Sequence, residues 1–365
     1  MKIGIEAQRL FRPSKYGVEW ITLELIHALQ KIDRRNDYFI FVKPDEDRSC
    51  YTPASNFHII EIPAYNSMHW EQIQLPRYMR RFRINLLHCT GNTAPVRRDI
   101  PLVLTLHDVL FMDEKAKMAT RYQQLGSRYK RWIVPRIVEQ SDCIITGSAV
   151  ERNHILQKFP EIDARTVRVI AGGAGEVFRT GRPEPPFTTP YFFFLGSTDP
   201  KRNTANVLEA FAQVADEYPE VSLVIADITR GYLEEVLAEI GRKALIRRIL
   251  ISEYIPRDQL PSIYRSASLF LYPSLRDSFG LPVLEAMASG VPVIASNHSV
   301  MHEITANAAL LVDPSQPSAI AAAIREVYSN RALADGLIRR GIEGAEAFSW
   351  ETAARQLLDI YESFK

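Results

Sequence analysis

The sequence predicts an α/β protein made of two doubly wound domains with parallel sheets, and three observations support this. Short apolar runs rich in β-branched residues alternate with longer amphipathic stretches along the chain, which is the rhythm of βαβ units whose strands are buried on both faces. The length of 365 residues, with 46% hydrophobic residues, favours two cores over one. Around residues 180–190 prolines interrupt the rhythm once, as a linker would.

The first half of the chain contains one set of these alternating segments. Strands are expected within 2–6, 38–42, 57–62, 85–89, 101–109, 142–148 and 166–173. The amphipathic runs 20–32 and 119–140 are expected to be helices, and the second of them is strongly basic. Residues 1–183 therefore form the first predicted domain.

The second half repeats the pattern. Strands are expected within 191–197, 222–227, 248–254, 268–274 and 291–296. Helices are expected within 206–218, 233–241, 259–267 and 282–290, and only helices after that. Residues 184–348 form the second predicted domain, and 349–365 form a final helix that packs back toward the first domain. Because parallel sheets bind ligands outside the carboxyl ends of their strands, we expect the site in a central crevice that both domains face.

Composition excludes several function classes. The formal net charge is +1, so no field of the whole molecule selects nucleic acid. Cys50, Cys89 and Cys143 are odd in number and far apart, which is typical of core thiols in a reducing compartment. No apolar run approaches the roughly 18 residues of a membrane span, and the first run is too short for a signal peptide. We therefore expect a cytoplasmic protein.

The stretch 274–296 places two acids among apolar residues. Pro282 suits the start of a helix and Gly290 the position after its end, so we expect a short helix over 282–289. The backbone N–H groups of Phe279, Gly280 and Leu281 would then lie at the positive end of the helix dipole, where phosphate binds.

The two acids have different predicted roles. Glu285 lies one turn into the helix, where the dipole favours the carboxylate, which can accept hydrogen bonds from a sugar diol. Asp277 lies in the preceding loop, near the phosphate, and sugar hydroxyls would engage it. Taken alone, each acid is better explained without a ligand, Glu285 as a first-turn acid that complements the dipole and Asp277 as a loop acid.

The whole stretch resembles the signature of the retaining glycosyltransferases of family four, which have the GT-B fold of two Rossmann-like domains. In that family two glutamates of the signature contact the donor sugar and the ribose of a nucleotide sugar. Glu285 matches the second glutamate. Asp277 replaces the first, and Ser278 replaces the glycine that follows it.

Other segments extend the resemblance over nearly the whole chain. Residues 194–211 are similar to a segment that carries two adjacent cations, here Lys201 and Arg202. The resemblance implies that these cations stabilise the leaving diphosphate. His107, at a strand end in the first half, would lie near the donor sugar.

The resemblance thus implies catalytic roles for His107, Lys201, Arg202 and Asp277. It implies that donor contacts come from loop glycines, strand ends and the signature helix, namely Gly17, Gly196, Ser197, Tyr254, Ile255, Ser278, Phe279, Gly280, Leu281 and Glu285. Gly17 would let the backbone approach the diphosphate, and the backbone near Tyr254 would contact the base.

The function implied is transfer of a hexose, with retention, from a nucleotide diphosphate sugar to a glycan or lipid-linked acceptor, as in bacterial mannosyltransferases of surface polysaccharide synthesis. GDP-mannose is the first expected donor, and another GDP- or UDP-sugar is the second. The first domain would bind the acceptor and the second the donor, without a metal or other cofactor. Two alternatives stay open: a nucleotide-sugar 2-epimerase of the same architecture, and a non-catalytic partner subunit.

Two basic runs, 75–83 and 121–136, interleave arginine and lysine with aromatic residues. This pattern suits peripheral contact with anionic lipid on the inner face of a membrane. An ordinary solvated basic helix explains it equally well.

Overall fold

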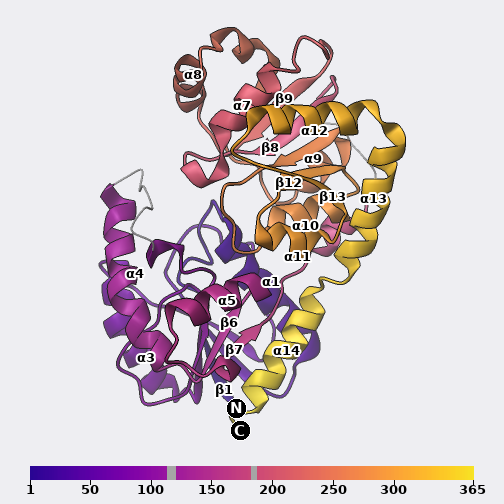
Figure 1. Cartoon of the computed structure of the whole chain (residues 1–365). Helices are drawn as coiled ribbons and strands as arrows, with labels where there is room; N and C mark the ends of the chain where they lie inside the picture. The colour runs from indigo at the N-terminus through magenta and orange to yellow at the C-terminus, as the bar shows by residue number, and fades with distance from the viewer. Residues whose placement is uncertain (113–120, 182–186) are drawn as a thin grey trace. The chain divides into compact units, whose positions relative to one another are not determined.

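The computed structural model describes residues 1–112, 121–181 and 187–365. These residues form two compact units, each built around one parallel sheet (Figure 1). Unit 1 comprises Met1–Gly172 and Trp350–Lys365, and unit 2 comprises Gly173–Ser349. The predicted α/β class with two doubly wound domains is confirmed.

The described sheet of unit 1 has seven strands in the order β3-β2-β1-β4-β5-β6-β7, and neighbouring strands are parallel. The strands are β1 (Lys2–Glu6), β2 (Asp37–Val42), β3 (Phe57–Glu61), β4 (Leu86–Cys89), β5 (Leu102–Thr105), β6 (Cys143–Thr146) and β7 (Val167–Val169). From β1 the chain proceeds to β2 and β3 on one side, then returns to β4 on the other side. The strand order therefore reverses between β1 and β4, and such a switch point is where these sheets bind ligands.

Unit 1 also contains helical segments, all of which except the last element α14 lie between its strands in the chain. They are α1 (Gly17–Ile32), α2 (Ser67–His69), η1 (Trp70–Gln74), α3 (Leu75–Phe82), η2 (Leu110–Met112), α4 (Arg121–Glu139), α5 (Ala149–Lys158), η3 (Ala164–Thr166) and α14 (Trp350–Glu362). The α4 helix lies within the predicted run 119–140, whose first two residues fall outside the described part of the chain.

The last helix, α14, belongs to unit 1, where it packs against α1 (Figure 1). Its apolar face buries Trp350, Leu357 and Tyr361, as the helical spacing of these residues requires. The Tyr361 hydroxyl lies 2.6 Å from Nδ1 of His88 on β4. Residues 350–365 therefore complete the core of unit 1.

The described sheet of unit 2 has six parallel strands in the order β10-β9-β8-β11-β12-β13. They are β8 (Tyr191–Leu195), β9 (Ser222–Ala226), β10 (Ile249–Ser252), β11 (Leu269–Tyr272), β12 (Val293–Ser296) and β13 (Ala309–Val312). The strand order reverses between β8 and β11, so the switch point of this unit lies there. We expected only helices after 291–296, and the strand β13 corrects that expectation.

The helical segments of unit 2 flank this sheet. They are α6 (Glu176–Arg179), η4 (Pro200–Arg202), α7 (Thr204–Ala212), α8 (Arg230–Glu239), η5 (Lys243–Arg248), α9 (Leu260–Ser266), α10 (Leu281–Ala288), α11 (Ser299–Thr305), α12 (Pro317–Ser329) and α13 (Arg331–Glu346). Within the unit, α12 packs on α7 and α13 packs on α10.

The division between the units differs from the predicted one. The predicted boundary at 183/184, with most of the proline-rich linker, lies outside the described residues. Unit 2 already begins at Gly173, because α6 packs within it: Phe178 is fully buried and its ring lies 6.0 Å from that of Tyr264, edge to face. In the described parts of the chain, no helix has the length and apolar character needed to cross a membrane.

Candidate active site

The predicted cations and the signature helix meet at the switch point of unit 2. Gly196 directly follows β8, and η4 carries Lys201 and Arg202 a few residues later. The loop after the neighbouring strand β11 leads into α10. This loop is attached to η4, because the backbone oxygen of Lys201 accepts hydrogen bonds from Leu275 N–H at 2.8 Å and from Ser274 Oγ at 2.9 Å.

Glycine at 280 is required by the start of α10. Gly280 is the N-cap residue and has a φ of 86°, a left-handed conformation that side chains disfavour. A Cβ at this position would also lie 2.7 Å from Cε of Met301. The helix begins at Leu281, one residue earlier than expected. Gly290 follows its end with a φ of 75°, as predicted for a residue that ends a helix.

The Asp277 carboxylate is engaged within its own loop. Its Oδ1 accepts three backbone hydrogen bonds, from Ser278 N at 2.8 Å, Phe279 N at 3.2 Å and Gly280 N at 3.2 Å. We expected the N–H groups of Phe279 and Gly280 to be available to a phosphate, and this expectation is wrong for this conformation. The short aspartate side chain folds back on the following residues, as aspartate does in tight turns.

The other oxygen of Asp277 binds a cation. Oδ2 lies 3.2 Å from NH1 of Arg202 and accepts a hydrogen bond from the Tyr272 hydroxyl. Burial by itself would raise the pKa of Asp277, but Arg202, Tyr272 and the backbone N–H groups outweigh it and hold the pKa below its usual value. The carboxylate is therefore ionised, and it fixes the Arg202 guanidinium 5.1 Å from the centre of the Tyr272 ring.

The two predicted cations have different environments. The Lys201 side chain is 45% exposed, and its ammonium lies 3.6 Å from Asp199. Burial alone would lower the pKa of Arg202, but Tyr272 and Asp277 raise it above its usual value. Arg202 is thus a fixed cation, whereas an exposed ammonium such as that of Lys201 can reorient toward a ligand.

Glu285 lies in the interior of unit 2. Its side chain is 2% exposed and forms an ion pair with Arg257. The Arg257 guanidinium in turn lies 4.6 Å from the centre of the Phe178 ring. Arg257 could not be predicted from a local pattern, because it lies in a loop far from α10 in the chain. In this conformation the Glu285 carboxylate is paired with the Arg257 guanidinium, which also orients it.

Two other predicted donor residues, Gly196 and Ser197, are held in place by local contacts. A Cβ at Gly196 would lie 2.9 Å from side-chain atoms of Ile225 and Ile228, so the contact with β9 requires glycine there. Ser197 Oγ accepts a hydrogen bond from Asp199 N at 3.1 Å.

The remaining residues of this set contribute mainly to the interior. The side chains of Ile255, Phe279 and Leu281 are buried, so contact with a ligand would come through their backbone groups. Tyr254 and Ser278 are half-buried.

Two further residues of unit 2, Asp227 and Tyr264, were not predicted from the sequence. Asp227 directly follows β9 and has a φ of 61°, and burial raises its pKa to about 6 although Arg202 lowers it. The Tyr264 hydroxyl is buried and forms no hydrogen bond with the described residues. A signal for Asp227 exists in the sequence, since an aspartate at the carboxyl end of a parallel strand lies at the binding edge of the sheet.

Two predicted residues lie in unit 1. His107 follows β5, and its Nε2 lies 2.8 Å from the Thr90 carbonyl oxygen. Because a carbonyl only accepts, Nε2 carries the proton and Nδ1 keeps a lone pair. Burial lowers the pKa of His107, which favours the neutral ring. Gly17 is the first residue of α1, and in the described part of the chain no atom outside its neighbours and its own helix backbone lies within 4 Å of the place where its Cβ would be.

Unit 1 also contains two buried carboxyl groups that sequence reasoning missed. Glu6 is the last residue of β1, and Glu71 lies in η1. Burial raises the pKa of Glu6 to about 7, and the nearby Glu71 contributes to this increase. Burial likewise raises the pKa of Glu71. Glu6 lies at the switch point between β1 and β4, where the first strand of a doubly wound sheet ends.

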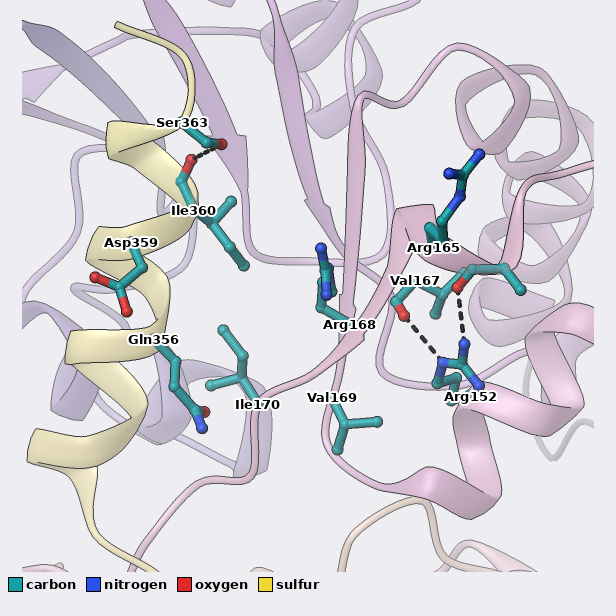
Figure 2. A pocket seen from close by; sticks show the side chains of 11 residues that line it. Arg152, Arg165, Val167, Arg168, Val169, Ile170, Gln356, Asp359, Ile360 and Ser363 are labelled. Carbon is teal, nitrogen blue, oxygen red and sulfur yellow. Dashed lines mark hydrogen bonds between the residues drawn. The ribbon is translucent and has the colours of Figure 1, made fainter.

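A cavity of about 630 Å³ lies elsewhere in unit 1, beside α14, η3 and β7 (Figure 2). Its lining residues are Arg152, Ala164, Arg165, Val167, Arg168, Val169, Ile170, Gln356, Asp359, Ile360 and Ser363. Arg152 donates to the carbonyl oxygens of Val167 at 3.0 Å and Ala164 at 2.8 Å (Figure 2). None of the predicted site residues lines this cavity.

Within residues 1–112, 121–181 and 187–365, no cluster of three or more histidine, cysteine, aspartate or glutamate side chains could hold a metal ion.

Solved structures share the architecture over the whole chain. Sucrose-phosphate synthase from Thermosynechococcus elongatus matches with a TM-score of 0.80 and 20% identity, over 99% of this chain and 98% of that one. The complex of Anabaena Alr3699/HepE with UDP-glucose matches with a TM-score of 0.75 and 17% identity, over all of both chains. At these identities the likeness concerns the fold, and the two doubly wound units define a protein of the GT-B class.

Two sequence families account for most of the chain. Residues 16–174 match Glycosyltransferase Family 4, and residues 180–344 match Glycosyl transferases group 1. The chain therefore belongs to the family-four glycosyltransferases.

Curated relatives are similar over parts of their length. O-antigen chain mannosyltransferase B of Escherichia coli is 32% identical over 47% of this chain and 45% of its own length. MMP alpha-(1->4)-mannosyltransferase of Mycolicibacterium hassiacum is 27% identical over 75% of this chain and 68% of its own length. D-inositol 3-phosphate glycosyltransferase of Streptomyces avermitilis is 28% identical over 63% of this chain and 51% of its own length. The matches thus span about half to two thirds of these relatives.

Proposed function

We propose that this protein transfers a hexose, with mannose as the first candidate, from a nucleotide diphosphate sugar to a glycan or lipid-linked acceptor with retention of anomeric configuration. Membership of the glycosyltransferases supports the reaction class. The names of two relatives, both mannosyltransferases, support mannose and hence GDP-mannose. The UDP-glucose complex of HepE keeps a UDP-sugar as the second candidate.

The observation that carries the proposal is the fixed Arg202 at the switch point of unit 2. Tyr272 and Asp277 hold its guanidinium at the carboxyl edge of the sheet, beside the start of α10. A preoriented cation stabilises charge that develops on a leaving diphosphate without reorganising during the reaction. Lys201 adds a second positive charge through its exposed ammonium group. We therefore assign the leaving-group stabilisation to this pair and not to a metal, so turnover should persist in a chelator.

Asp277 receives a different role from the one the family signature implies. Both of its oxygens are engaged by the loop, Tyr272 and Arg202. We therefore assign it the positioning of Arg202, and we assign the hydroxyl-binding role to Glu285 together with Arg257. The donor-sugar contact of the signature's first glutamate would then come from neighbouring groups, such as the backbone of the loop.

The acceptor is assigned to unit 1, and a membrane contact is part of the proposal. Exposed arginines lie on α3 (Arg77, Arg80 and Arg81). On α4 the Arg136 guanidinium lies 4.8 Å from the ring centre of Trp132, whose side chain is 52% exposed. Exposed arginine and tryptophan together suit an anionic lipid surface, where a lipid-linked acceptor would be found. Salt-sensitive binding to vesicles that contain anionic lipid tests this contact.

A thermal-shift panel with GDP, UDP, ADP and their sugars tests the donor assignment. A ligand at 100 times its dissociation constant adds about 2.7 kcal/mol of stability. We expect GDP and GDP-mannose to give the largest shift, with UDP and its sugars second. If no nucleotide diphosphate stabilises the protein, the proposal fails.

Two rival functions are separated by product analysis. A 2-epimerase would change the donor sugar without an acceptor, which NMR of the donor alone detects. A non-catalytic subunit would neither hydrolyse nor transfer the sugar.

A further inference from the structure

The carboxyl edge of unit 1 has binding features of its own beside the predicted residue His107, whose Nε2 lies 2.8 Å from the Thr90 carbonyl oxygen. Glu6 ends β1, and Thr90 and Gly91 follow the neighbouring strand β4. The Thr90 hydroxyl donates to the Glu6 backbone oxygen at 2.7 Å and joins the two strand ends. Because the strand order of this sheet reverses between β1 and β4, Glu6 and Gly91 lie where a doubly wound sheet binds its ligand.

The Glu6 side chain is buried, and its carboxyl group interacts with the backbone N–H groups of Gln8 and Thr90. It is 7% exposed, and its Oε1 accepts a hydrogen bond from Gln8 N at 2.9 Å. Among the described residues, no side chain donates to its carboxyl group. Burial disfavours an ionised carboxyl group even when backbone N–H groups bind it, and the raised pKa of Glu6 reflects this burial.

Gly91 leaves a space in front of this carboxyl group. Apart from its chain neighbours, the only atom of the described residues within 4 Å of the place where a Cβ at Gly91 would lie is Oε2 of Glu6, at 3.5 Å. Gly91 has no positive φ, so the backbone does not require glycine here. The absence of a side chain thus gives access to Oε2, and an alanine would occupy this space without backbone strain.

Glu71 differs from Glu6 because its oxygens are satisfied. Oε1 accepts hydrogen bonds from the Tyr129 hydroxyl at 2.5 Å and from Gln72 Nε2 at 2.7 Å, and Oε2 accepts one from the Thr93 hydroxyl. Glu71 therefore holds the loop around Thr93 and leaves Glu6 as the carboxylate that can accept from a ligand.

We propose that Glu6 and Gly91 form a subsite that binds a hydroxyl group of a neutral sugar residue of the acceptor. A carboxylate oxygen with an open side accepts hydrogen bonds from sugar hydroxyls. A phosphate at the same place would meet both Glu6 and Glu71, and like charges there oppose binding. The charge of Arg9 lowers the pKa of both carboxyl groups, but Arg9 also faces Glu19, with 3.8 Å between NH1 and Oε1. The subsite thus excludes acceptors that present a phosphate to it.

The identification of the bound sugar as part of the acceptor rests on the proposed function. The test of the subsite measures binding and does not depend on turnover. The probes are methyl α-mannopyranoside, which is neutral, and mannose 6-phosphate, with binding measured by saturation-transfer NMR. The variants are Gly91→Ala, which fills the space, and Glu6→Gln, which keeps an oxygen for Gln8 N–H but removes the charge. The matched control is Gly231→Ala in α8, where no described atom beyond the neighbouring residues and the helix backbone lies within 4 Å of the Cβ position.

We expect the parent and Gly231→Ala to bind the neutral glycoside at least tenfold more tightly than the phosphorylated sugar. Gly91→Ala and Glu6→Gln should each weaken binding of the neutral glycoside at least tenfold. Thermal shifts with GDP and UDP should be the same in all four proteins, because Glu6, Gly91 and Gly231 are not among the predicted donor residues. The inference is overturned if the parent does not bind the neutral glycoside, if it prefers the phosphorylated sugar, or if either folded variant binds like the parent. A parent that binds the glycoside but no nucleotide contradicts the proposed function and not the subsite.

Discussion

At the scale of single residues, Asp277 illustrates how one methylene changes the role of an acid before a helix. The aspartate carboxylate reaches its own backbone and accepts from three consecutive N–H groups. Its second oxygen is left for Arg202 and Tyr272. A glutamate would place the carboxylate farther from the loop and nearer to a ligand, which is the role in the family signature.

Replacement of Asp277 by asparagine tests this positioning role. Asp277→Asn removes the counter-charge of Arg202, and the loss of a charged hydrogen bond costs about 1.5–3 kcal/mol. If this energy orients the guanidinium for the leaving step, turnover falls about 10- to 100-fold, while affinity for GDP or UDP falls much less.

Asp199→Asn is the matched control, because Asp199 is an exposed aspartate beside Lys201 and exposed pairs contribute little. Steady-state kinetics and calorimetry of both variants make the measurement. Equal effects at the two positions would contradict the role of Asp277.

The buried pair of Glu285 and Arg257 predicts a change in stability. Glu285→Gln weakens a charged hydrogen bond in the interior of unit 2, so the free energy of unfolding should fall by about 1.5–3 kcal/mol. Nucleotide affinity should fall as well, because the carboxylate that accepts from a ribose diol is lost. Urea denaturation and nucleotide titration measure the two effects, and an unchanged free energy of unfolding would show that the pair is not a stabilising element.

Glu6 predicts a pH dependence of stability. Its pKa rises from 4.5 to about 7 on folding, because of burial and Glu71, against the opposing effects of Gln8 N–H, Arg9 and Thr90 N–H. The folded state therefore binds the proton more tightly, so this contribution is fully present below pH 4.5 and is lost as the pH rises through 7.

Glu6→Gln cannot ionise, whereas the other groups around the site remain in both proteins. The melting temperature of the parent should therefore fall relative to that of Glu6→Gln between pH 5 and pH 8. A constant difference in melting temperature across this range would show that Glu6 keeps an ordinary pKa.

At the scale of elements, the start of α10 depends on one glycine. Gly280 and Gly290 both have positive φ angles, 86° and 75°, but only at Gly280 would a Cβ meet a close neighbour, Cε of Met301 at 2.7 Å. Gly290→Ala should cost about 1–2 kcal/mol from its backbone conformation alone. Gly280→Ala should cost more, because Met301 must also move. Urea denaturation of the two variants measures the difference, and equal costs would mean that Met301 adapts freely.

Most elements could be predicted from the sequence because buried parallel strands are continuous apolar runs. The strand β13 (Ala309–Val312) was not predicted because it is short, contains alanine and lies between helices. The start of α10 shifted by one residue because Gly280, and not Leu281, takes the N-cap position.

The site was predictable only in part. Short-range patterns located Arg202, Asp277 and Glu285. They could not show that Asp277 binds Arg202 or that Glu285 binds Arg257, because these partners are far apart in the chain and meet only when strands and loops pack. Glu6 was missed because its unusual pKa arises from burial at the switch point, which no local pattern reports.

At the scale of the whole molecule, each unit has one switch point with its own chemistry. The edge of unit 2 presents Lys201 and Arg202, which suit a diphosphate. The edge of unit 1 presents Glu6 beside Gly91, which suits a neutral hydroxyl. In our proposal, this division of charge separates the donor from the acceptor. It follows that substitutions in unit 2 change nucleotide affinity or turnover, whereas substitutions at Glu6 or Gly91 change acceptor affinity alone.

The central claim, retaining sugar transfer with Arg202 stabilising the leaving diphosphate, is tested most directly by NMR of the product that forms from GDP-mannose or UDP-glucose and methyl α-mannopyranoside. We predict an α-linked disaccharide from the parent, and we predict that Arg202→Ala lowers turnover at least tenfold while its affinity for the nucleotide changes less than threefold. A β-linked product, an epimerised donor, or an Arg202→Ala variant that turns over as fast as the parent would contradict the account.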